Sequence, residues 1–285
     1  MITKKYYLVC AATVAVVFFV IPIAFLIGLF RTPKFQLYYE VYKANKTCTE
    51  KREIVDERIL FKKLYDVWTI VPDAFSFRHC DVSKFDFNKF AGAPVNFGLY
   101  LEYSNVTDAQ LKTICQFKAI DALNLTGCTH ITDVGICEIA NLENLRILYL
   151  ADTNVTNSGV HTLRDLKRLH SLDLSHTRVK GSAFCAKDGW RRLRTLDMPG
   201  CVLTDDCFDF MPNIVNLEVL NFSVNDDNYL PPNVENLLKC KHINSLGISG
   251  KNLKNNSDEG LPEEILEKLR TSCKVHVNKL EPAAP

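Results

Sequence analysis

The chain has 285 residues, of which 47% are hydrophobic and 24% are charged, with 34 basic and 33 acidic side chains. This composition excludes a disordered or collagen-like chain, and the formal charge of +1 excludes global electrostatic capture of nucleic acid. Eleven cysteines are too few in a chain of this length for a miniprotein held together by disulfides.

A short N-terminal tail, residues 1–5, precedes a run from residue 6 to residue 30 that contains no charged side chain. As a helix this run is about 37 Å long, enough to cross a hydrocarbon layer of about 30 Å. A cleaved signal peptide is the alternative, but it has a shorter apolar stretch and a small-x-small cleavage site, which Ile27–Arg31 does not offer. We therefore predict a single-pass transmembrane helix of the signal-anchor type over residues 6–30.

Basic residues flank the run on both sides, so the charge bias does not fix its orientation. The short N-terminal tail favours a membrane protein whose larger part lies on the exported side. The scattered, unpaired pattern of the cysteines favours a reducing compartment, so the two orientations stay open.

Residues 31–70 are charged and carry a helix-like apolar stripe that includes Ile54, Leu60, Leu64 and Trp68. We predict a juxtamembrane helical cap that covers the first of the units described next. A free helical stalk is the alternative.

A short pattern of two apolar residues around one variable residue recurs eight times after this segment. The second apolar residue of each copy falls 24 to 26 residues after the last, at Phe77, Leu101, Leu125, Leu150, Leu174, Met198, Phe222 and Ile248. Self-similarity at such a period is typical of solenoid proteins. In each copy the alternation predicts a short strand, and Thr-Asp or Thr-Asn after it predicts the N-cap of a helix.

The repeat resembles the leucine-rich repeat in its cysteine-containing form, as in F-box-type adaptors and bacterial membrane-anchored repeat proteins. The resemblance covers residues 71–277 and implies an α/β solenoid, with a curved parallel sheet on the concave face and helices on the convex face. The segment Leu269–Val277 resembles the helix and strand that close such arrays. Residues 278–285 are then a frayed tail.

The alignment of the repeats sorts the cysteines into groups. Cys80, Cys128 and Cys201 occupy the inward-turning slot after the strand, which Thr153, Thr177 and Asn225 fill in other copies. The helix layer is expected to contain Cys115, Cys137, Cys185 and Cys207. For Cys240 and Cys273, free thiols and a disulfide between them both stay open.

The middle residue of each strand is expected to face outward from the concave sheet. Tyr100, Tyr149, Asp173 and Asp197 occupy this position, and Glu102 lies in the flanking column. Tyrosines provide contact area at low entropic cost and carboxylates favour a basic partner, so these five residues are the predicted partner-binding site. An ordinary solvated sheet surface is the alternative.

Catalytic constellations are not visible in the sequence. Asp173, Ser175 and His176 are close in sequence, but we interpret them as strand and turn residues. There is no phosphate-binding glycine loop and no metal-ligand spacing, so we expect a non-enzymatic protein without metal or cofactor.

Six Asn-x-Ser/Thr sequences occur. Asn124 and Asn221 lie in the middle of predicted strands, where a sugar would obstruct the sheet surface. The possible glycosylation sites are Asn45, Asn105, Asn154 and Asn255.

The leading functional prediction is a membrane-anchored protein-protein interaction module that binds an unidentified protein through its concave face. The first alternative is an F-box-like substrate-recognition subunit of a ubiquitin ligase, although no convincing F-box precedes the repeats. The second is an assembly factor for a mitochondrial inner-membrane complex, although the first 30 residues do not resemble a transit peptide.

Overall fold

The computed structural model describes residues 74–92, 96–186, 189–224, 230–250 and 263–279. The predicted tail 1–5, anchor 6–30 and juxtamembrane segment 31–70 lie outside these ranges. Within the ranges, none of the helices combines the length and apolar character needed to cross a bilayer.

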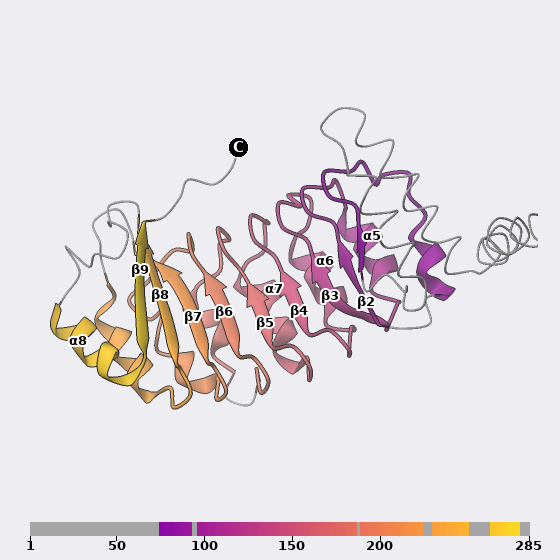
Figure 1. Ribbon diagram of the computed structural model, residues 1–285. Helices are drawn as coiled ribbons and strands as arrows, with labels where there is room; N and C mark the ends of the chain where they lie inside the picture. Colours follow the sequence, from indigo (N-terminus) through magenta and orange to yellow (C-terminus); the bar gives the residue numbers. More distant parts are fainter. Residues whose placement is uncertain (1–73, 93–95, 187–188, 225–229, 251–262, 280–285) are drawn as a thin grey trace, which may run out of the picture.

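The described strands form one parallel sheet in which each strand pairs with the next along the chain (Figure 1). The nine strands are β1 (Ala74–Ser76), β2 (Phe97–Tyr100), β3 (Ile120–Asn124), β4 (Ile147–Tyr149), β5 (Ser171–Asp173), β6 (Thr195–Met198), β7 (Val219–Ser223), β8 (Ser245–Gly250) and β9 (Lys274–Lys279). Strand order equal to chain order confirms the predicted parallel sheet and fits a leucine-rich repeat arrangement.

Short helices connect the strands and cover one face of the sheet. They are η2 (Phe87–Gly92), α5 (Asp108–Ile114), α6 (Asp133–Ile139), α7 (Asn157–Thr162), η3 (Leu163–Asp165), η4 (Gly181–Phe184), η5 (Met211–Asn213), η6 (Pro232–Lys239) and α8 (Glu263–Ser272). We call the sheet face turned away from these helices, the predicted concave face, the open face.

The helical half of the repeat is more variable than the sequence predicts. Three successive connections contain the α-helices α5, α6 and α7, whereas the connections of η4, η5 and η6 hold tighter 3-10 turns. Proline lies at the start of η5 and of η6, where it supplies no backbone N–H. At Gly181 in η4, an added Cβ would lie 1.8 Å from the Cys207 carbonyl oxygen, so neighbouring turns here approach too closely for a side chain.

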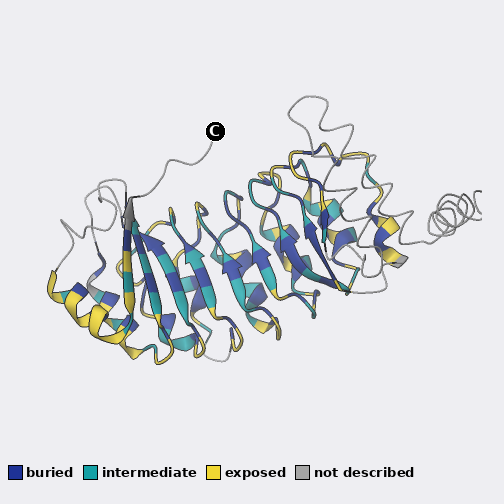
Figure 2. Ribbon diagram, in the orientation of Figure 1, coloured by how far each residue is buried: buried dark blue, intermediate teal, exposed yellow. Residues whose placement is uncertain are grey.

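The core is a continuous row of the repeated apolar residues. In β4, Tyr149 lies between Leu148 and Leu150 in the sequence. Both leucines are fully buried, whereas Tyr149 is half-buried. The same alternation marks β5, β6 and β8, and Figure 2 shows buried and intermediate positions alternating there along the sheet. Burying such an alternation requires neighbouring repeats on both sides, so the repeats fold as one stack.

The first described repeat replaces leucine with phenylalanine. Its rings contact one another edge to face and in stacks, with centroids 4.6–6.4 Å apart; they belong to Phe75, Phe77, Phe85, Phe87, Phe90 and Phe97. Large rings fill the end of the stack, where a smaller side chain would leave space.

The cysteines of the inward-turning slot are buried, as predicted, and two of them also bond to the preceding repeat. The Cys128 thiol donates to the Leu101 carbonyl oxygen of the preceding repeat, 3.0 Å away. The Cys201 thiol donates to the Leu174 carbonyl oxygen at the same distance of 3.0 Å. Both cysteines are buried, and burial raises the pKa of both thiols, so they are inert structural donors.

A second chain of hydrogen bonds runs through the helix starts. Thr132 caps α6 and Thr156 caps α7, as the Thr-Asp and Thr-Asn pairs predict. The Asp133 carboxylate accepts from the Thr156 backbone N–H at 2.8 Å and from its hydroxyl at 2.6 Å. Asp108 accepts in the same way from Thr132, at 3.0 and 2.7 Å. In these two repeats an aspartate thus fixes the cap of the next helix.

The C-terminal closure follows the prediction, since helix α8 and strand β9 end the described array. Strand β9 continues to Lys279, two residues past the expected end of the array. One expectation is wrong: Cys137 and Cys185 are exposed, whereas Cys115 and Cys207 are buried in the helix layer as predicted. The thiols of Cys240 and Cys273 are both free.

Candidate protein-binding face

The predicted binding residues form one row across the open face. The register aligns Tyr100 with Asn124, Asn124 with Tyr149, Tyr149 with Asp173, and Asp173 with Asp197. Neighbouring strands lie about 4.8 Å apart, so the row from Tyr100 to Asp197 spans roughly 19 Å. All of these positions are half-buried, which places them on the surface without leaving them fully solvated.

Amide side chains order the carboxylates of the row. Asn124 donates from Nδ2 to Oε1 of Glu102 at 3.0 Å, and its own Oδ1 accepts from the Thr126 backbone N–H at 3.0 Å. Asn221 donates from Nδ2 to Oδ1 of Asp197. The asparagines therefore hold two acidic side chains in fixed positions, which a binding surface requires.

The acidic end of the row carries unfavourable electrostatics. Burial raises the pKa of the Asp197 carboxyl, the negative charge of Asp173 raises it further, and the hydrogen bond from Asn221 opposes the shift. Burial also raises the pKa of the Tyr149 phenol, with smaller contributions from Tyr100, Asp173 and Asp197. No described cation forms an ion pair with Asp173 or Asp197. A positive group placed over these strands would relieve that repulsion.

Glu102 has one oxygen without a partner. Its Oε1 accepts from Asn124, whereas its Oε2 is buried and accepts no hydrogen bond. An unsatisfied carboxylate oxygen that is buried in this way costs free energy.

The Asp173, Ser175 and His176 group is a turn. The backbone N–H of Ser175 donates to Oδ1 of Asp173 at 2.9 Å, and the Ser175 hydroxyl donates to the same oxygen. His176 has φ = 56°, and its ring lies where a Cβ on Gly200 would be, 2.2 Å from Nδ1. The imidazole is thus packed on the next turn and makes no described hydrogen bond to Ser175.

The sequon side chains that the structure describes are engaged between repeats. Asn105 donates from Nδ2 to Asp81 at 2.7 Å, and Asn154 donates from Nδ2 to the Thr129 carbonyl oxygen at 2.7 Å. Asn45 and Asn255 lie outside the described residues. Glycosylation at these four sites stays a prediction.

No group of three or more histidine, cysteine, aspartate or glutamate side chains is arranged to hold a metal ion in the described part of the chain. The described open face therefore offers hydrogen bonds, ring contacts and negative charge.

Comparisons with known proteins bear only on the fold. No family model matches the chain, and no curated protein sequence matches it significantly. Among the solved structures that match is a crystal structure of an internalin from Listeria monocytogenes, with 15% identity and a TM-score of 0.36. The match covers 61% of this chain and 57% of the internalin chain, so it spans less than two thirds of that protein.

Proposed function

We propose that the chain is a non-catalytic, membrane-anchored interaction module that binds a protein with a basic surface through its open face. The acidic end of the row supports this most directly, because Asp197 and Asp173 repel one another there without a described counter-ion. A cationic side chain of the partner would pair with these two carboxylates. Tyr100 and Tyr149 would supply the ring contacts beside these charges.

A double variant tests the binding face. Tyr149→Ala removes a ring, and Asp173→Asn removes a charge while keeping an oxygen that can accept from Ser175. The tagged full chain is cross-linked in its native membrane, and the proteins captured by wild type and variant are compared. We expect the variant to lose its partner. The control Glu267→Gln, which removes one exposed charge on α8, should keep it. Equal capture by all three proteins would rule out the open face.

The anchor has its own test. The run 6–30 is long enough to span a bilayer, so the full chain should stay with membranes during alkaline extraction, and a chain without this run should be released. Protease protection in sealed vesicles reports which side holds the repeats, and we propose the exported side. A mobility shift with glycosidase would place the sequons in an exported compartment. Release of the full chain by alkali would contradict the anchor.

No observation on the described residues favours the F-box-type ligase subunit or the mitochondrial assembly factor over this function. Neither is proposed. The cysteine-bearing repeats that suggested them are explained by the slot hydrogen bonds of Cys128 and Cys201.

A further inference from the structure

Basic side chains gather at the edge of the sheet where the strands begin. The segments just before β4, β5 and β6 each contain basic residues, and we call this set of residues the basic rim. Its members are Arg146, Lys167, Arg168, His170, Arg191, Arg192 and Arg194. Because the strands are parallel, their starts share one edge of the sheet. His170 is half-buried, and the other six residues are exposed.

The centre of the basic rim is a line set by the backbone. The N–H of His170 donates to the Arg146 carbonyl oxygen at 2.9 Å, and the N–H of Arg194 donates to the His170 carbonyl oxygen at 2.9 Å. These residues therefore step from turn to turn at the strand spacing, with Arg146 and Arg194 roughly 10 Å apart. Burial, and then the charges of Arg146 and Arg194 on the neighbouring turns, lower the pKa of His170.

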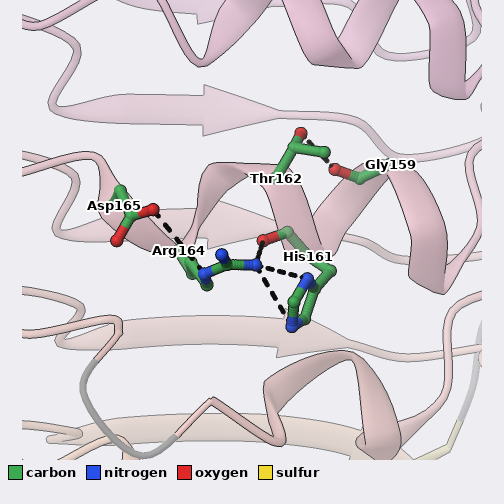
Figure 3. Close-up of polar contacts among 5 residues, drawn as sticks. All are labelled: Gly159, His161, Thr162, Arg164 and Asp165. Atoms are coloured by element: carbon green, nitrogen blue, oxygen red, sulfur yellow. Dashed lines mark hydrogen bonds and ion pairs between the residues drawn. The ribbon is translucent and has the colours of Figure 1, made fainter.

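Several of these cations have no ion-pair partner in the described part of the chain. Among the described residues, no carboxylate forms an ion pair with Arg146, Arg168 or Arg192, and Arg194 has one with Glu218 at 3.3 Å. The nearby Arg164 is different, since it contacts His161 at 2.6 Å and Asp165 at 3.6 Å (Figure 3). Arg164 and Arg194 therefore have ion-pair partners, whereas Arg146, Arg168 and Arg192 have none among the described residues.

We propose that the basic rim binds an acidic polypeptide segment that runs across the starts of β4, β5 and β6. The cations form a line, and a line of charges matches an extended peptide better than it matches the flat surface of a membrane. Arginine predominates over lysine in the set, and its planar fork pairs with carboxylates through two hydrogen bonds. Glu143 and Glu218 lie at the same edge of the sheet. They would repel a uniformly anionic bilayer, whereas a peptide can place its carboxylates at a distance from them. The surface is separate from the open face and extends the proposed function to a second partner segment.

The test uses the full chain in an uncharged detergent and a fluorescein-labelled peptide of ten glutamates, followed by fluorescence anisotropy at low salt. The rim variant is Arg146→Gln/Arg168→Gln/Arg192→Gln. The matched control is Arg78→Gln/Arg178→Gln/Lys180→Gln, which removes the same three charges from exposed positions after strands, at the opposite edge. Thermal unfolding of each protein checks that the variants are folded.

Wild type should bind the peptide, and added salt should weaken binding because the contacts are exposed. The rim variant should lose about tenfold in affinity, as three exposed charge contacts would give, and the control should lose less than about twofold. Binding should persist in Tyr149→Ala/Asp173→Asn, so failure of the open face would not be mistaken for failure of the rim. Equal losses in rim variant and control, or no binding by wild type, would overturn the proposal. So would rim-dependent binding of micellar short-chain phosphatidylserine without peptide binding, since a lipid surface would then be the ligand.

Discussion

The aspartates that begin α5 and α6 should be a main source of coupling between their repeats and the next, and Asp133 provides the sharpest test. Its carboxylate accepts two hydrogen bonds from Thr156, at 2.8 and 2.6 Å. Both residues are half-buried, so water replaces part of what Asp133→Ala removes. Taking about 1 kcal/mol for each bond and about 0.5 kcal/mol for the helix dipole gives a loss of about 2.5 kcal/mol. That corresponds to a fall of roughly 5–10 °C in Tm for an array of this size.

A second substitution isolates the carboxylate itself. A Cβ on Gly159 would lie 2.4 Å from Oδ1 of Asp133, so Gly159→Ala should cost about 2 kcal/mol in wild type. In the Asp133→Ala background that oxygen is absent, and the same change should cost less than about 1 kcal/mol because alanine favours helices. The full chain in detergent is unfolded with heat and with denaturant, and circular dichroism follows each variant. The control Asp165→Ala, whose side chain is 80% exposed, should change stability by less than about 0.5 kcal/mol. Identical costs of Gly159→Ala in both backgrounds would refute the reasoning.

Three further predictions concern the core, the rim and the thiols. Leu148→Ala should lower the free energy of unfolding by about 3–4 kcal/mol, since Leu148 is fully buried, and a loss below about 1 kcal/mol in denaturant titrations would contradict that packing. Arg146→Gln should raise the pKa of His170 towards its ordinary 6.5, as an NMR titration would show. Because the pKa of His170 is lower in the folded than in the unfolded protein, acidification below about pH 6.5 should destabilise wild type more than the variant. Iodoacetamide should modify exposed Cys137 in the native protein and spare Cys207, whose pKa burial raises to about 12, until unfolding; mass spectrometry checks the order.

The sequence was sufficient for the sheet because its repeat encodes both period and direction. Leu148 and Leu150 alternate with an outward-facing residue, and the same pair returns one repeat later at Leu172 and Leu174. A period of 24 residues leaves no room for another strand between copies, so strand order follows chain order. The open-face row follows in turn, because the register aligns equivalent positions such as Tyr149 and Asp173.

The helix layer was harder to predict because local contacts there override the pattern. Cys137 has the spacing of a core residue but points to solvent from α6. At Gly181 the backbone of the next repeat is too close for any side chain, a contact that depends on how two turns stack. The unsatisfied Oε2 of Glu102 was equally hidden, since its burial depends on the folded structure.

The basic rim was missed for another reason, because only the residue in the middle of each strand was compared from one repeat to the next. Reading the position two residues before the first leucine gives Arg146, His170 and Arg194 at intervals of 24, a column as regular as the leucines themselves. A net charge of +1 conceals it, because the open face carries Asp173 and Asp197 in the same repeats. In a solenoid, residues one period apart become neighbours about 4.8 Å apart, so each column accumulates its own charge. A partner that carries both a basic patch and an acidic segment would therefore be held in one orientation, since exchanging the two would set like charges against each other at both surfaces.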